Sequence, residues 1–248
     1  MTVLRPGPLP TYDWASRQPH SGLVGDWAVD LPPVRAASTA RLPDSPPPSP
    51  GDLEVVAHPR IRNLAAYWHE GWPYSGPTAW LRPEAANRLG DAVSRLPDGF
   101  GLAIWDAWRD PRLQQCLHDT VYQDTSLPPD FVAEPDPDPR RCPPHATGGT
   151  VDLTLTWRNE PLALGTRFDA FVPEAAAAAL EPDGPLPARD LRRLLASVLS
   201  ACGFVVLPQE WWHWEYGTRW WAAVEGSRPL FGHGAPPATG AAPVTGAS

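Results

Sequence analysis

The sequence contains no lysine, only three cysteines and a single methionine in 248 residues. All 20 basic residues are arginines, they form no long run, and the net charge is −8, so they could not neutralise a row of phosphates. We therefore expect neither nucleic acid nor an anionic membrane surface as a partner. Three cysteines at irregular spacing do not make a disulfide framework, and they fit a reducing compartment.

Long apolar runs are missing as well. No stretch approaches the ~20 apolar residues that cross a bilayer, and the opening letters MTVLRPGPLPTYDW lack the apolar run of a signal peptide. We therefore expect a cytoplasmic protein that does not engage a membrane.

Proline, in contrast, is abundant, with 34 residues in 248, and it is concentrated near the N-terminus. Residues 1–51 are predicted to form a mostly extended arm, which could be passive or could serve as a Pro-rich ligand for another domain. Residues 232–248 consist of small residues with little to bury, and this predicts a disordered tail. Residues 52–231 are left as a single domain with enough apolar residues for one core.

Helical and strand patterns alternate within this domain. Apolar residues at helical spacing occur in 83–96, 111–123, 174–180 and 188–203. Strand patterns occur in 100–108, in 150–157, where Val, Leu and Leu alternate with polar residues, and in 204–217. The absence of a regular βαβ rhythm predicts a single compact α+β domain, with a central, mainly antiparallel sheet flanked by helices.

Three short strings bring together residue types that bind metals. They are HATGGTVD from His145 to Asp152, EWWH from Glu210 to His213, and DAWR from Asp106 to Arg109. Two imidazoles and one carboxylate would hold zinc and leave a fourth position open for water, as in catalytic zinc sites. Glu210 could then carry a proton from the water to a leaving amine. Such spacings also arise by chance, so the neighbouring letters must discriminate.

The neighbouring letters do discriminate. The strings DAWRDPRLQ, PHATGGTVDLTL and EWWHWEYG, in this order, resemble the zinc D-alanyl-D-alanine dipeptidases related to VanX, over about residues 55–225. The resemblance implies one zinc ion per chain, held by His145, Asp152 and His213, with Glu210 as general base and acid. It also implies the compact α+β fold shared by D,D-carboxypeptidases and the hedgehog signalling domain.

Further roles are implied by the same resemblance. Arg109 would stabilise the tetrahedral oxyanion. Asp106 would orient Arg109 and is counted with the substrate-binding residues. Gly165 to Asp169 is similar to the family's Gly-Thr-x-Phe-Asp segment, which implies that Asp169 binds the ammonium end of the dipeptide. Read without the resemblance, Asp169 could cap a following helix.

Two positions depart from the family pattern. Pro143 stands where many relatives have a serine that helps to bind substrate, and Asp110 adds a carboxylate beside Arg109. The proposed zinc ligands and Glu210 are all present. The sequence therefore predicts a zinc metallopeptidase that hydrolyses D-alanyl-D-alanine or a close D,D-dipeptide.

Other functions and assemblies stay open at this point. A D,D-carboxypeptidase or peptidoglycan endopeptidase on the same fold would act on longer peptides, and a non-catalytic zinc module would bind without turnover. The small D,D-dipeptide is the expected partner, while a homo-oligomer is left open. The sequence does not distinguish glycopeptide resistance from peptidoglycan turnover.

Backbone geometry supplies two further predictions. Residues three apart on a regular strand point to opposite faces, so Glu210 and His213 can meet at one metal only if the chain bends at Trp211 and Trp212. A turn at Gly148 and Gly149 would likewise fold His145 over the start of the strand that carries Asp152.

Some neighbouring residues have competing interpretations. Glu215 could hydrogen-bond a metal ligand or face solvent. Cys142 could be paired with His145 as a nucleophile, although no electropositive setting is visible around it. The tryptophans of 211–221 could stack on carbohydrate, but core packing is the favoured interpretation.

Overall fold

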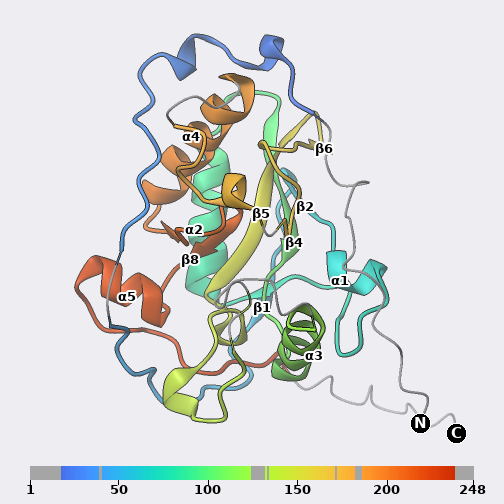
Figure 1. Cartoon of the computed structure of the whole chain (residues 1–248), viewed down its shortest axis with the longest axis vertical. Coiled ribbons are helices and arrows are strands. Elements are labelled where there is room, and N and C mark those ends of the chain that lie inside the picture. The colour runs from blue at the N-terminus through green and yellow to red at the C-terminus, as the bar shows by residue number, and fades with distance from the viewer. Residues whose placement is uncertain are drawn as a thin grey trace, which may run out of the picture.

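A computed structural model describes residues 18–38, 41–123, 132, 134–170, 172–181 and 186–237. It shows an α+β domain with a six-stranded sheet in the order β2-β4-β5-β8-β7, in which β6 pairs with β5 (Figure 1). Only the pair β2–β4 is parallel, and the other pairs are antiparallel. The predicted fold class is confirmed. The strands of this sheet are β2 (Ile61–Asn63), β4 (Phe100–Asp106), β5 (Thr150–Trp157), β6 (Glu160–Pro161), β7 (Val205–Val206) and β8 (His213–Glu215).

The two long strands, β4 and β5, form the centre of the domain. Their sequence patterns at 100–108 and 150–157 had predicted strands, and both are confirmed. The alternation of apolar and polar residues in 150–157 is typical of a half-buried strand, but that interpretation is wrong for β5, because Thr154 and Thr156 on its polar side are also buried. The hydroxyl of Thr154 donates to the carbonyl of Leu162, so the segment after β6 covers this face and satisfies its polar groups.

Helices pack around the sheet where the sequence predicted three of them. α2 (Pro83–Ser94) begins with proline in its first turn and buries Ala85, Leu89 and Val93. It lies against α4 (Leu186–Ser200), which also contacts β5 and β7. The N-cap of α3 (Pro111–Val121) is Asp110, whose side chain accepts from the backbone N–H of Arg112. Short elements complete the described structure: α1 (Ala66–His69), α5 (Arg219–Glu225), and the two-stranded sheet of β1 (Glu54–Val55) and β3 (Trp80–Leu81).

The helix predicted at 174–180 is wrong. Only a 3-10 turn at Pro173–Ala175 forms there, followed by turns. The buried side chain of Arg192 explains the difference. Its guanidinium donates to the carbonyls of Leu164, Glu174 and Ala176, so the last two carbonyls are engaged outside any helix. Tertiary hydrogen bonds thus override the helical propensity of the alanines.

Both flanking segments contact the domain where they are described. Short 3-10 turns at Ser21–Leu23 and Asp26–Ala28 contact α4, and Leu23 and Val34 join the core. The blue segment in Figure 1 runs along the outside of the domain here. Residues 1–17, 39 and 40 of the predicted arm and 238–248 of the predicted tail lie outside the described residues. The domain boundaries at 51 and 231 stay a prediction.

One buried arginine ties distant segments together. Arg82 donates through Nε to the carbonyl of Thr147 and through Nη2 to that of Gly232, and its Nη1 lies 3.3 Å from a carboxylate oxygen of Asp52. The backbone N–H of Gly234 also donates to the carbonyl of Ala146. Segments from both sides of the domain therefore hold the turn that follows residue 145.

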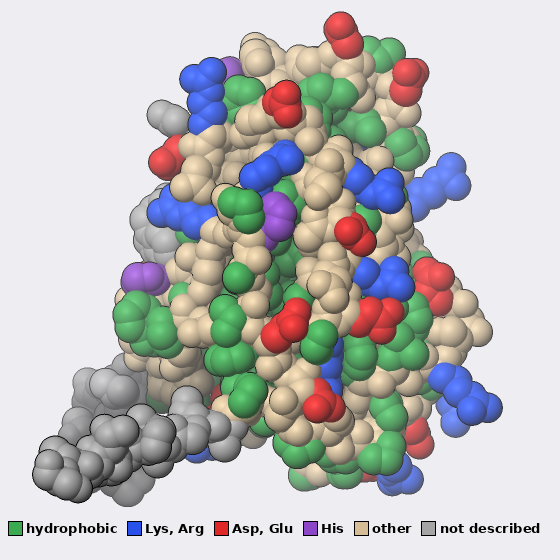
Figure 2. Space-filling model, turned by 180° about the vertical axis from the view of Figure 1, so that it is seen from behind, with side chains coloured by type: hydrophobic (Ala, Val, Ile, Leu, Met, Phe, Trp, Pro, Cys, Tyr) green, Lys and Arg blue, Asp and Glu red, His purple; other side chains and the backbone are tan. Residues whose placement is uncertain are grey.

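The surface agrees with the charge pattern of the sequence. On the face seen in Figure 2, basic and acidic side chains are interspersed with hydrophobic ones. No helix in the described part of the chain is long and apolar enough to cross a bilayer.

Candidate metal centre

His145 and Asp152 are brought together by a tight turn before β5. His145 begins the 3-10 turn His145–Thr147, and Gly148 follows in the left-handed region with φ 74°. At Gly149 a Cβ atom would lie 2.3 Å from the carbonyl oxygen of Tyr216, so only glycine fits there. The predicted turn at Gly148 and Gly149 is confirmed, and it places His145 over the start of the strand.

His213 arrives from the neighbouring strand. It is the first residue of β8 and lies directly opposite Asp152 in the antiparallel register. The chain is not extended before it, since Trp211 and Trp212 form a turn. The predicted irregularity is confirmed, and it brings Oε2 of Glu210 to 3.6 Å from Nδ1 of His213.

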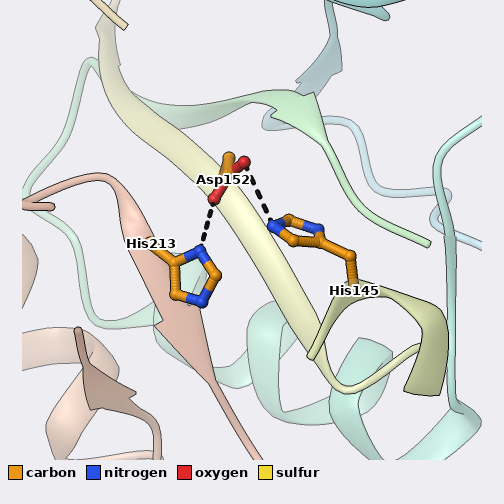
Figure 3. Close-up of side chains that lie close together, drawn as sticks. All are labelled: His145, Asp152 and His213. Atoms are coloured by element: carbon orange, nitrogen blue, oxygen red, sulfur yellow. Dashed lines mark ion pairs between the residues drawn. The ribbon is translucent and has the colours of Figure 1, made fainter. Parts of the chain in front are cut away.

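The three side chains form one buried cluster with the carboxylate between the two rings (Figure 3). Nε2 of His145 lies 3.3 Å from Oδ2 of Asp152, and Nδ1 of His213 lies 3.1 Å from Oδ1 of Asp152. One ligand atom from each residue lies within 4.8 Å of the other two. The three are at most 4% exposed.

The outer nitrogen of each ring is held by a different partner. Nδ1 of His145 lies 2.6 Å from the carbonyl oxygen of Ala107, and because a carbonyl only accepts, Nδ1 carries the proton. Nε2 of His213 lies 2.9 Å from Oε1 of Glu215. Both rings can therefore present a lone pair toward Asp152, which is how outer hydrogen bonds orient metal-binding histidines.

The donor set fits a divalent cation. Oδ1 of Asp152 is buried, and no hydrogen bond reaches it from the described residues, although His213 lies close by. A buried, unsatisfied carboxylate oxygen is costly unless a cation balances it. Two imidazoles and one carboxylate suit zinc, whose bonds to nitrogen are about 2.0–2.1 Å long. These residues could hold one zinc ion.

The electrostatics of the cluster couple its members. Burial lowers the pKa of His213, but the nearby carboxylates of Asp152 and Glu215 outweigh burial and raise this pKa to about 10. Burial also raises the pKa of Asp152, yet the two histidines hold it well below its usual range. The cluster therefore binds positive charge strongly, whether as protons or as a metal ion.

Glu210 is a buried carboxyl beside the cluster. Burial raises its pKa to about 8, the charge of His213 opposes the shift, and the carboxylates of Asp152 and Asp169 add to it. A pKa near the pH of the reaction is what a group that takes up and returns a proton requires.

Arg109 lies close to Asp152, at the carboxylate oxygen that also faces His145. Its Nη2 is 3.4 Å from Oδ2 of Asp152, its Nε donates to Asp106 over 2.8 Å, and its Nη1 donates to Gln114 over 2.7 Å. Burial alone would lower the pKa of Arg109. The surrounding groups Tyr67, Asp106, Asp152 and Asp169 more than offset this and raise the pKa above its ordinary value, so the guanidinium stays charged. Arg109 is thus a fixed positive charge beside the cluster.

Asp169 is connected to the cluster through a tyrosine. The hydroxyl of Tyr67 donates to Oδ2 of Asp169 over 2.9 Å and accepts from Nη2 of Arg109 over 3.3 Å. Burial raises the pKa of Asp169 to about 7, and the charge of Asp152 adds to the shift. The capping alternative is wrong, because the next described helical turn starts at Pro173 with Val172 as its N-cap.

A cavity of about 400 Å³ opens onto these groups. Asp106 instead lines a second cavity of about 250 Å³, which Arg109 also lines. The predicted site residues that line the first cavity are Arg109, His145, Asp152, Asp169, Glu210 and His213. Six of the seven predicted side chains therefore share one space.

The sequence missed two residues of this site. Tyr67 lies in a short helix far from every motif, and nothing in its local pattern signals a role. Gln114 occupies the buried face of α3 between Leu113 and Leu117, and a polar residue on an apolar helix face is a signal that could have found it.

Competing interpretations of neighbouring residues are also settled. Glu215 is buried and hydrogen-bonded to His213, and it does not face solvent. Burial raises the pKa of Cys142 to about 12, which does not suit a nucleophile. Trp211, Trp212 and Trp214 pack in the core and Trp221 packs against it, whereas Trp220 lines the cavity.

Comparison with known proteins agrees with this geometry. Residues 83–224 match the family described as D-ala-D-ala dipeptidase (peptidase M15). A D-alanyl-D-alanine dipeptidase of Synechocystis sp. is 26% identical over 190 residues, covering 63% of this chain and 77% of that protein. Those of Streptomyces coelicolor and Escherichia coli are 34% and 31% identical, covering 51% and 54% of this chain and 67% and 65% of theirs. Since the family match spans more than half of the sequence, the chain belongs to the D-Ala-D-Ala dipeptidase family.

Proposed function

We propose that this protein is a zinc-dependent D,D-dipeptidase that hydrolyses D-alanyl-D-alanine to free D-alanine. The observation that carries the proposal is the buried cluster of His145, Asp152 and His213, with the carboxyl of Glu210 close to His213 and the guanidinium of Arg109 close to Asp152. Membership of the family supports the reaction.

Glu210 is the proton carrier in this proposal. It takes a proton from the water that attacks the peptide carbonyl, and it returns a proton to the leaving amine. When bound to the three ligands, zinc supplies a Lewis acid that polarises the carbonyl, acidifies water and favours the carboxylate form of Glu210. Its short distance to His213 keeps Glu210 within reach of that water.

The remaining residues bind and orient. Arg109 offers positive charge to the oxyanion that develops on the carbonyl, and Asp106 and Gln114 fix its guanidinium from behind. Asp169, paired with Tyr67, receives the ammonium group of the dipeptide. Asp106 thus acts through Arg109 and not by touching the substrate.

The test is the release of free D-alanine from D-alanyl-D-alanine by the purified chain. We expect a chelator to abolish the release and added zinc to restore it. The variant Glu210→Gln should retain zinc and lose about 10²–10⁴-fold in kcat, because it keeps the shape but not the proton transfer. No release from folded, zinc-loaded protein would refute the proposal.

The same assay addresses the alternatives. A carboxypeptidase would cleave a pentapeptide that ends in D-Ala-D-Ala faster than the dipeptide. A binding module would take up zinc, and Glu210→Gln would change no rate. We expect the free dipeptide to be cleaved faster than the pentapeptide.

A further inference from the structure

Arg219 is a cation on the wall of the cavity that the proposed mechanism does not use. It is the first residue of α5, and its half-buried side chain lines the same cavity as His213 and Glu210. Its Nε donates to the carbonyl of Pro43 over 2.6 Å, which fixes the guanidinium group. No carboxylate of the described residues forms an ion pair with it, so both Nη atoms remain for a ligand.

The other arginines of this cavity are already engaged. Arg109 holds Asp106 and Asp152, as described above. Arg141 lies 3.3 Å from a carboxylate oxygen of Asp136, and its side chain is 64% exposed. Arg219 is therefore the cavity arginine, among the residues that the structure describes, without an acidic partner.

A continuous series of side-chain contacts connects Asp169 to the residue next to Arg219. It runs from Asp169 through Tyr67, Arg109 and Asp152 to His213. From His213 it continues through Glu215 to Thr218, the neighbour of Arg219. Asp169, Arg219 and the metal cluster line one cavity, and the two outer groups reach the cluster through different partners: Asp169 through Tyr67 and Arg109, and Arg219 through Thr218 and Glu215.

The unpaired guanidinium of Arg219 is suited to a small anion. The cavity that it lines also has apolar surface, contributed by Leu42, Pro143 and Trp220. A guanidinium beside apolar walls binds a carboxylate more strongly than one in bulk water, and its two Nη groups match the two oxygens of a carboxylate. A free dipeptide carries an ammonium group at one end and such a carboxylate at the other.

We propose that Arg219 binds the free C-terminal carboxylate of the substrate and makes the enzyme selective for peptides that end in a free acid. This inference rests on the proposed dipeptidase function and adds a specificity-determining residue to it. It assigns the two charged ends of the dipeptide to Asp169 and Arg219.

The test compares D-alanyl-D-alanine with its C-terminal amide, D-alanyl-D-alaninamide, in the zinc-loaded full chain. Wild type should prefer the acid. R219M should raise KM for the acid by about 10–100-fold, because a charge-assisted pair is lost, and should leave kcat/KM for the amide within about threefold. R219K should restore part of the preference for the acid. R141Q, which alters the exposed and paired arginine of the cavity, is the matched control and should keep the full preference for the acid over the amide.

The ratio of kcat/KM for acid and amide is the decisive readout. It is measured on one preparation, so the folded fraction cancels even if loss of the Pro43 contact destabilises R219M. An unchanged ratio in R219M, or an equal loss on both substrates, would overturn the role of Arg219. Wild type that cleaves neither substrate would instead refute the dipeptidase proposal itself.

Discussion

The two histidines of the cluster are held in different ways. The outer nitrogen of His145, Nδ1, faces the neutral carbonyl of Ala107. The carboxylate oxygen nearest to Nδ1, that of Asp106, is 3.4 Å away and already accepts from Arg109. Behind His213 stands the carboxylate of Glu215, which in turn accepts from the hydroxyl of Thr218.

This difference predicts different roles for the two histidines. A backbone carbonyl fixes the tautomer and direction of a ring but adds no charge, whereas a carboxylate also makes the ring more basic. The half of the site on β8 should therefore control the affinity for metal and protons. The half on the 145–147 turn should control geometry.

Removal of a ligand should have the largest effect. His213→Ala leaves only two protein ligands, and we expect it to lose stoichiometric zinc, as measured by metal content after dialysis. Circular dichroism should show the fold retained. Full zinc content in this variant would contradict the assignment of His213.

Removal of the carboxylate behind His213 should have the next largest effect. Glu215→Gln keeps the shape and a hydrogen bond but removes the charge, and we expect zinc affinity to fall by about 10–100-fold. Competition with a chromogenic chelator measures this. Glu70→Gln, which changes an exposed acid outside the site, is the control. Equal zinc affinities in Glu215→Gln and Glu70→Gln would contradict the proposed difference between His145 and His213.

The pH dependence of the chelated protein should show the same asymmetry. The pKa of His213 is about 10 in the folded chain, against about 6.5 ordinarily, so its proton favours folding. This contribution is complete below pH 6.5 and is lost as pH rises toward 10. Thermal midpoints measured with chelator should fall less steeply over pH 7–10 for His213→Gln than for wild type. Equal slopes of thermal midpoint against pH in the two proteins would contradict the pairing of His213 with Asp152 and Glu215.

The smallest effect is expected at Thr218. Its hydroxyl supports Glu215 and also caps α5, where it accepts from the backbone N–H of Trp221. Thr218→Val should lower the free energy of unfolding by about 0.5–2 kcal/mol and weaken zinc binding only a few-fold. Denaturant titration and chelator competition measure these changes. A loss of affinity as large as that of Glu215→Gln would mean that Thr218, and not Glu215 alone, sets the basicity of His213.

The parts of the fold predicted correctly are those with strong local patterns. The helix at 83–94 has proline in its first turn and apolar residues at helical spacing, and the strands at 100–106 and 150–157 are nearly continuous in burial. The failure at 174–180 came from a partner outside the segment. No local pattern shows that Arg192 takes up the carbonyls of the alanine run.

The same distinction applies to the site. Glu210 and His213 share one short string, so the bend between them followed from strand geometry alone. Tyr67 could not be predicted, because its link between Arg109 and Asp169 is made by folding and not by sequence spacing. Asp106 was expected near the substrate, but it lines the second cavity and not the one that the metal cluster lines.

The contacts of Arg82 bear on when the site forms. Its acceptor on Gly232 is 150 residues away along the chain, and its acceptor on Thr147 belongs to the turn that starts at His145. Contacts of such sequence separation form late in folding, because closure of long loops costs entropy. During synthesis the residues of β5 leave the ribosome well before Gly232 does. The turn that carries His145 is therefore expected to become fixed only after the segment with Gly232 has been made, and a nascent chain without that segment should hold a metal ion more weakly than the folded protein.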